Sequence, residues 1–138
     1  MDYQNMIKVN NHARLDMRSD TVTQPTRGML DAMVSAPLGD DVYGDDPTAN
    51  ELQQFAAKLL GKEASLFLSS GTQSNLCAML TQCQRGEEII TGEHYHVFDS
   101  EAGGASALGG IMFATVPHTK NGSIKSSDII KKIKPDDA

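Results

Sequence analysis

The sequence predicts an α/β protein in which helices flank a mostly parallel sheet. From residue 64 onward, short apolar runs and helical patterns alternate in the order strand, helix, strand, helix, strand, helix. The runs lack the polar alternation of a half-exposed strand, which is typical of strands buried on both faces of a parallel sheet. Small hydroxyl residues follow the first run, at the strand end where ligands of such sheets gather. Together these features predict consecutive βαβ units.

Two helices are expected ahead of the sheet. Thr26 is a candidate N-cap for an amphipathic helix within residues 25–36, where apolar residues recur at helical spacing. Asp46 and Pro47 suit the cap and the first position of a second helix, and Gly61 supplies its left-handed stop. Caps and turns also explain, better than a calcium site does, five aspartates of this region: Asp20, Asp40, Asp41, Asp45 and Asp46.

The first two strands are expected to enclose one helix. The run ASLFLS, residues 64–69, predicts a buried strand, and the pattern over residues 72–83 predicts a helix that closes near Gly86. The run EEIITG, residues 87–92, predicts the second strand. This order is the start of a parallel sheet, because a helix between two strands returns the chain to the same edge.

The remaining elements continue the alternation. The small residues of 100–110 predict a partly helical segment, and GIMFATVP, residues 110–117, predicts a third strand. After a turn, Ser126 or Ser127 is the expected cap of a last helix over residues 127–134, and a proline ends that helix.

Composition restricts the partners. The chain has 138 residues, of which 39% are hydrophobic, so we expect one domain or part of a larger one. A net charge of -6 and a pI near 5.0 argue against nucleic-acid binding, since the basic cluster KKIK at residues 131–134 is short. No apolar run has the length of a membrane-spanning helix, and the start of the chain has no signal-peptide core. We therefore expect a cytoplasmic protein with no nucleic-acid and no membrane partner.

The stretch SSGT, residues 69–72, predicts an anion site. The first N–H groups of a helix have no intrahelical partner, and the helix dipole is positive there. The P-loop pattern and the Rossmann pattern GxGxxG are both absent, which disfavours nucleoside triphosphates and dinucleotides. A single phosphate on the N–H groups of Gly71, Thr72 and Gln73 fits better. A plain capped helix is the alternative reading of this stretch.

Histidines and carboxylates gather in the stretch TGEHYHVFDSEAGG, residues 91–104. An extended backbone would place His94 and His96 on one face, because side chains alternate along a strand. Near the carboxylates Glu93, Asp99 and Glu101, such a pair could hold a metal ion and serve a metal-dependent hydrolase. The other reading is an imidazole that lies on an aromatic cofactor, whose phosphate occupies the helix start at Gly71. The residues themselves leave both readings open.

Three stretches together resemble the low-specificity L-threonine aldolases. They are LDMRSDTVTQPT (15–26), the run from GDDVYGDDPT to SGTQSNL (39–76), and CQRGEEIITGEHYHVFDSEAGGASALGG (83–110). Those aldolases are pyridoxal-phosphate (PLP) enzymes of the aspartate-aminotransferase fold. The resemblance implies that residues 15–138 are the N-terminal part of the large domain of a fold-type-I PLP enzyme. Residues 1–14 would then be an N-terminal extension.

The resemblance also implies roles for particular residues. Gly71 and Thr72 would hold the cofactor phosphate, and His96 would stack on the pyridine ring and act as an acid or base. Ser19 would contact the substrate carboxylate, and Tyr43 would lie in a loop near the active site, often at a subunit contact. The implied reaction cleaves L-threonine or L-allo-threonine to glycine and acetaldehyde. A homo-oligomer is the implied assembly.

The resemblance has one departure, which concerns the lysine that binds the cofactor covalently. In the family this lysine, an acid for the pyridinium proton and an arginine for the substrate carboxylate come from later segments. The sequence motif that surrounds the cofactor-binding lysine in the family matches none of the eight lysines of this chain. These are Lys8, Lys58, Lys62, Lys120, Lys125, Lys131, Lys132 and Lys134. We therefore expect the N-terminal half of an aldolase, either a fragment or one product of a split gene, which is inactive alone. A complementing C-terminal chain, if it exists, would restore activity. A non-catalytic assembly module is the remaining alternative.

Overall fold

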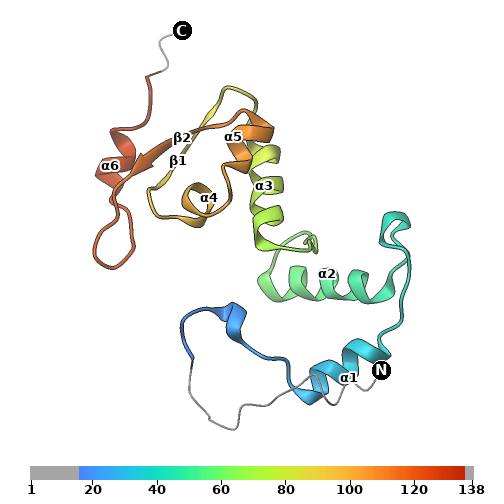
Figure 1. Cartoon of the computed structure of the whole chain (residues 1–138). Helices are drawn as coiled ribbons and strands as arrows, with labels where there is room; N and C mark the ends of the chain where they lie inside the picture. Colours follow the sequence, from blue (N-terminus) through green and yellow to red (C-terminus); the bar gives the residue numbers. More distant parts are fainter. Residues whose placement is uncertain (1–15, 136–138) are drawn as a thin grey trace. The chain divides into compact units, whose positions relative to one another are not determined.

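The computed structural model describes residues 16–135, so the expected extension at residues 1–14 lies outside the described residues. The chain forms two compact units, and the boundary between them lies between Glu63 and Ala64 (Figure 1). The first unit consists of short and long helices with their connecting loops, and the second contains a small sheet with helices. The α/β prediction is therefore confirmed.

The first unit holds α1 (Arg27–Ser35) and α2 (Pro47–Leu60), together with the 3-10 turns η2 (Asp20–Val22) and η3 (Asp41–Tyr43). Both predicted caps are present. The Thr26 hydroxyl accepts a hydrogen bond from the Met29 N–H at 3.3 Å, and the Asp46 carboxylate accepts one from the Ala49 N–H at 2.8 Å. Gly61 ends α2 in the left-handed region, with φ of 62°.

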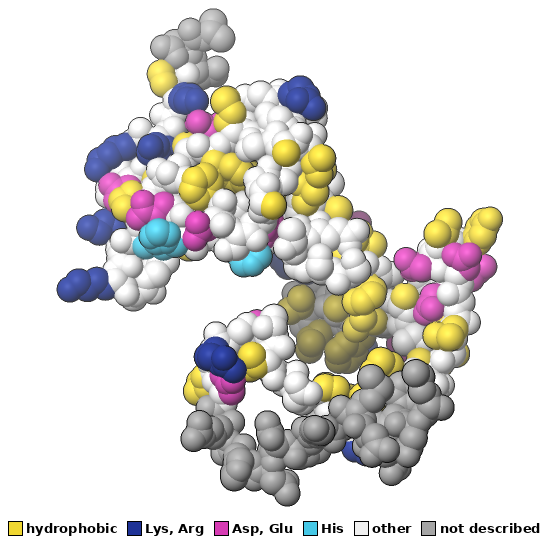
Figure 2. Space-filling model, in the orientation of Figure 1, with side chains coloured by type: hydrophobic (Ala, Val, Ile, Leu, Met, Phe, Trp, Pro, Cys, Tyr) yellow, Lys and Arg dark blue, Asp and Glu magenta, His cyan; other side chains and the backbone are white. Residues whose placement is uncertain are grey.

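Much of the apolar surface of α1 and α2 is exposed. Ala57 is the one buried residue among the described residues of this unit. Large apolar side chains on both helices are exposed: Met29, Met33, Val34, Leu52, Phe55, Leu59 and Leu60. Figure 2 shows hydrophobic side chains, coloured yellow, at the surface of this part of the chain. Caps and helix propensity, more than a core, therefore define these helices within the unit.

The loop ahead of α2 is fixed by its own polar groups. The second oxygen of Asp46 accepts the Gly39 N–H at 3.1 Å, and the Thr48 hydroxyl donates to the Pro37 carbonyl at 2.7 Å. A Cβ on Gly39 would collide with the Asp45 carbonyl, so this position needs glycine. Asp40 caps η3 by accepting the Val42 N–H at 2.9 Å. Asp40 and Asp46 thus serve as caps, as predicted.

The second unit is built on a two-stranded parallel sheet of β1 (Glu88–Gly92) and β2 (Met112–Val116). The register pairs Glu88 with Met112 and Gly92 with Val116. Its helices are α3 (Gly71–Gln82), α4 (His96–Asp99), α5 (Gly104–Gly109) and α6 (Ser126–Ile130). No helix within residues 16–135 is long and apolar enough to cross a membrane.

A small core lies between the sheet and the helices. Its fully buried side chains are Ile111 and Val116, with Ala105 and Ala114 beside them. A Cβ on Gly109 would collide with the Leu80 side chain, so a glycine lets α5 approach α3 closely. The rings of Phe98 and Phe113 pack edge to face with centroids 5.7 Å apart, which holds α4 on β2.

Two predicted elements differ from the structure. Residues 64–69 do not form a strand, and the side chains of Leu66 and Phe67 are 70% and 57% exposed. A strand exists only through the ladder with its neighbour, and in the described sheet β1 and β2 pair with each other alone. The last helix starts at Ser126 and ends at Ile130, and its cap is Lys125, without a side-chain bond. The predicted serine cap and the length to residue 134 are therefore wrong.

Candidate functional site

The carboxyl ends of β1 and β2 lie at one edge of the sheet because the strands are parallel. The chain continues from Gly92 into a turn over residues 93–95 and then into α4. The Glu93 N–H donates to the Val116 carbonyl at 3.0 Å, which keeps this turn at the strand ends. Histidine side chains follow both strands, so this edge is the place to search for chemistry.

His96 is bound to a buried carboxylate. Its Nδ1 lies 2.7 Å from Oε1 of Glu101, and the Asn75 amide donates to the same oxygen at 2.6 Å. The His96 side chain is 64% exposed, whereas that of Glu101 is 3% exposed. An ionised carboxylate can only accept a hydrogen bond, so this contact favours the tautomer of His96 with hydrogen on Nδ1.

Glu101 stays ionised within this environment. Burial raises the pKa of its carboxyl, but the hydrogen bonds from His96 and Asn75 outweigh that effect, and the pKa lies below its usual value. Its other oxygen, Oε2, is buried and has no hydrogen-bond partner in the described part of the chain. The turn after it is strained, because Ala102 has a positive φ of 53° directly before Gly103 at 65°.

At the start of α3, the N–H groups of Gly71 and Thr72 have no acceptor among residues 16–135. Ser70 is the N-cap, and its hydroxyl accepts the Gln73 N–H at 3.1 Å. The Gln73 side chain in turn accepts from the Ser69 N–H and the Ser69 hydroxyl, at 3.1 and 2.8 Å. Gln73 was predicted to be one of the phosphate donors. Its N–H instead donates to the Ser70 hydroxyl within the protein. The N–H groups of Gly71 and Thr72 remain as the expected donors, since no intrahelical carbonyl reaches them.

The space beside this helix start is open. A Cβ built on Gly71 would meet no atom within 4 Å, so a group as large as a phosphate can approach the backbone. Asn75 follows Gly71 by four residues on α3. Residues four apart lie on the same face of a helix, separated by a rise of about 6 Å. The first turns of α3 therefore carry both the expected anion donors and Asn75, an anchor of the His96–Glu101 pair.

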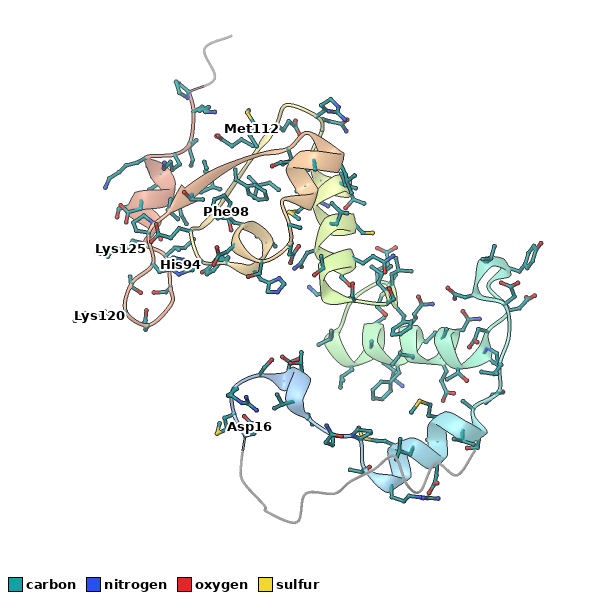
Figure 3. The ribbon with its side chains drawn as sticks, in the orientation of Figure 1. Asp16, His94, Phe98, Met112, Lys120 and Lys125 are labelled. Carbon is teal, nitrogen blue, oxygen red and sulfur yellow. The ribbon has the colours of Figure 1, made fainter. Side chains whose placement is uncertain are left out.

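His94 belongs to a different cluster. Its ring meets that of His118 edge to face with centroids 5.5 Å apart, and the Tyr95 ring lies tilted by 42° against that of His118 with centroids 4.7 Å apart. Figure 3 shows His94 beside the loop that follows β2, which carries Lys120 at its tip. The prediction that His94 and His96 share one face is wrong, because residues 93–95 form a turn and His96 starts a helix.

His118 was missed by the sequence reading. It stands two residues after the end of β2, in a stretch that resembled an ordinary turn. Its Nε2 is buried without a hydrogen-bond partner among the described residues, and a Cβ on Gly92 would collide with it. Its position after a strand end was the signal that could have found it. Within residues 16–135, no three His, Cys, Asp or Glu side chains gather closely enough to hold a metal ion.

Ser19 and Tyr43 both belong to the first unit. The Ser19 hydroxyl caps η2 by accepting the Thr21 N–H at 3.3 Å. Tyr43 is the last residue of η3, and its side chain is 79% exposed. Both side chains are accessible in their own unit, and their substrate roles stay predictions.

Comparison with known proteins identifies the family. A sequence model of the beta-eliminating lyases matches residues 16–138. The low specificity L-threonine aldolase of Escherichia coli (strain K12) is 54% identical over 123 residues, which are 89% of this chain and 37% of that protein. An Arabidopsis thaliana low-specificity L-threonine aldolase is 46% identical over 111 residues (80% and 31%), and the Saccharomyces cerevisiae one 39% over 123 (88% and 32%).

These identities confirm the resemblance carried by the three motif stretches. The chain spans about a third of the length of these relatives. The matched region includes α3, the turn with His96 and the sheet. The chain belongs to the beta-eliminating lyase family.

Proposed function

We propose that this chain supplies the phosphate and ring contacts of a PLP-dependent lyase that cleaves L-threonine and L-allo-threonine to glycine and acetaldehyde. The observation that carries the proposal is the arrangement on α3, where free N–H groups at Gly71 and Thr72 precede the Asn75 anchor of His96. The names of the relatives reported above support cleavage of threonine.

The residues fit the phosphate of PLP. Two free N–H groups, the positive end of the α3 dipole and the exposed Thr72 hydroxyl all favour an anion, and Gly71 leaves room for it. The exposed His96 ring has the flat shape that can cover an aromatic ring. When bound, the protonated pyridine ring of PLP accepts the electron pair released as the Cα–Cβ bond breaks.

His96 is the candidate acid–base group. Cleavage of a β-hydroxy amino acid requires removal of the proton from the β-hydroxyl. With Nδ1 donating to Glu101, the free Nε2 lone pair can accept that proton or orient a water that accepts it. Ser19 would bind the substrate carboxylate through its hydroxyl, and Tyr43 would lie in a loop close to the substrate or to a neighbouring subunit.

Two features of the proposal concern the whole enzyme. We expect none of the eight lysines of this chain to bind the cofactor covalently, because none stands in a matching motif. The expected assembly is a homo-oligomer or a complex with a complementing chain.

The metal-dependent hydrolase built on His94 and His96 loses its support, because the two side chains belong to different clusters.

Product analysis tests the proposal. The natural protein that contains this chain is incubated with PLP and L-threonine, and glycine and acetaldehyde are quantified. We expect equimolar formation of both, at a rate that a metal chelator leaves unchanged. Release of ammonia and a keto acid instead would show elimination at Cβ and would reject the aldolase reaction. Cleavage that a chelator removes and zinc restores would show that a metal ion takes part in the reaction and would count against the proposal.

A further inference from the structure

We propose that Asn75 and Glu101 are positioning residues that hold His96 in its Nδ1–H form, so that Nε2 faces the reacting group with a lone pair. This inference rests on the proposed function and extends it to two residues with no assigned role. Neither needs to touch the substrate or the cofactor, because each acts through His96.

The geometry allows one hydrogen arrangement. Oε1 of Glu101 lies 2.7 Å from Nδ1 of His96 and 2.6 Å from the Asn75 amide nitrogen. An ionised carboxylate accepts and cannot donate, so both contacts require a hydrogen on nitrogen. Nδ1 of His96 therefore carries a proton. A histidine whose Nδ1 is protonated must present Nε2 as the basic atom whenever the ring is neutral.

The three groups are fixed by separate elements. Asn75 comes from α3 and His96 opens α4, while Glu101 sits in the turn between α4 and α5. The Ser100 N–H donates to the His96 carbonyl at 2.9 Å, and the Gly104 N–H donates to the Glu101 carbonyl at 3.0 Å. Rigid backbone on both sides is what a preorganised acid–base pair needs.

A purely structural ion pair explains the site less well. Burial of a carboxylate is costly and is repaid only when both of its oxygens are satisfied, yet Oε2 of Glu101 has no partner among the described residues. The buried Glu101 carboxylate binds the imidazole of His96, whose side chain is 64% exposed. A strained positive φ at Ala102 follows directly. Strain and a buried charge directed at an exposed ring are typical of functional sites.

The first test reads the tautomer directly. The natural protein that contains this chain is labelled with ¹⁵N-histidine, and long-range nitrogen–proton NMR spectra assign each ring, with His96→Asn identifying the His96 signals. We expect His96 to be protonated at Nδ1 in the neutral ring. Glu101→Leu, which removes the acceptor, should shift the population toward Nε2–H, whereas Glu101→Gln, which keeps an acceptor oxygen, should retain Nδ1–H. An Nε2–H ring in the unmodified protein would overturn the inference, even if the leucine variant failed to fold.

The second test uses kinetics and a matched control. Glu101→Leu should lower kcat by about tenfold to a hundredfold with little change in KM, the size expected for loss of a charge-assisted hydrogen bond. Asn75→Ala should act in the same direction and more weakly. The control Glu93→Leu removes an exposed carboxylate 4.0 Å from His94 and should leave kcat unchanged.

A double-variant comparison separates positioning from folding. In a His96→Asn background, Glu101→Leu should cause no further loss of kcat, because its effect passes through the imidazole. An equal loss in both backgrounds would show that Glu101 supports the fold alone and would overturn the inference. Absence of threonine cleavage in the unmodified protein would reject the proposed function instead, while the NMR result would still decide the state of His96.

Discussion

A single carboxylate oxygen organises the candidate site at the level of residues. Oε1 of Glu101 receives hydrogen bonds from Asn75 and His96, and so it ties a group on α3 to the first residue of α4. The sequence spacing of five residues between His96 and Glu101 becomes a direct contact in the fold. His94, two residues earlier, is directed to His118 instead. The hydrogen bond to Glu101 therefore distinguishes His96 from His94 as the candidate acid–base group at this edge of the sheet.

Replacement of Thr72 tests the phosphate contact. Thr72→Val keeps the shape and removes the hydroxyl, so PLP affinity should fall by about tenfold to a hundredfold, the range for one charge-assisted hydrogen bond. Titration of the natural protein with PLP, followed by absorbance, measures the change. Thr81→Val is the matched control, because its hydroxyl bonds to the Ala78 carbonyl at 2.8 Å near the other end of α3. Equal affinity in the Thr72 variant would remove this residue from the site.

The two histidines should respond differently to the same substitution. His96→Asn removes the acid–base group and should lower the rate of threonine cleavage by about a hundredfold or more. His94→Asn should change the rate by no more than about twofold, an effect of a merely peripheral contact. Steady-state kinetics on both variants decide the matter. A larger loss in the His94 variant would show that the assignment of His96 is wrong.

The buried carboxylate predicts a specific pH dependence of stability. The pKa of Glu101 is lowered in the fold, so its ionised form adds stability above the unfolded pKa, and that contribution disappears as pH falls through the folded value. The melting temperature of the unmodified protein should therefore exceed that of Glu101→Gln at about pH 6, and the difference should shrink toward about pH 3. A difference that is constant over this range would contradict an ionised Glu101.

At the level of elements, α2 was the most predictable part of the fold. Asp46, Pro47 and Gly61 mark its two ends by local chemistry, and the helix begins and ends where they stand. The loop before it adds a second bond to Asp46 from the Gly39 N–H. The pKa of Asp46 is lowered by these backbone hydrogen bonds, from Ala49 and then from Gly39.

Removal of this cap should loosen the first turn of α2. Asp46→Ala should lower the local opening free energy and speed amide exchange in this turn, because the Ala49 and Gly39 amides both lose an acceptor. Hydrogen exchange of the peptide that covers the start of α2 measures this change. Asp45→Ala is the control, since the bond from Asp45 to the Asp40 carbonyl uses its backbone N–H and survives the substitution. Equal exchange in the two variants would show that the cap is unimportant.

Elements that depend on distant partners were harder to predict. The sequence located β1 and β2 because each has an apolar run, and the two runs pair with each other. Residues 64–69 have the same character but no strand assignment, since a run of apolar residues does not specify which ladder it joins. The Asn75–Glu101 contact spans 26 positions of the chain, so no local pattern announces it. Gly71, Thr72 and His96 were predicted through motifs, whereas His118 was missed because its cluster forms only when β1 and β2 align.

At the level of the whole molecule, the proposal draws on both units of the chain. Gly71, Thr72 and His96 belong to the second unit, whereas Ser19 and Tyr43 belong to the first. Ser19 and Tyr43 have accessible side chains, as residues that meet a substrate require. Under the proposed function, Ser19 would contact the substrate carboxylate, and Gly71 and Thr72 would hold the cofactor phosphate.

A crystal structure of the natural protein containing this chain, with PLP bound, is the measurement that tests the central claim most directly. We predict that the phosphate oxygens lie within hydrogen-bond reach of the Gly71 and Thr72 N–H groups, and that the His96 ring covers the pyridine ring with Nδ1 still on Glu101. A phosphate bound elsewhere, with the first turn of α3 free of ligand and His96 away from the ring, would contradict this account of the site.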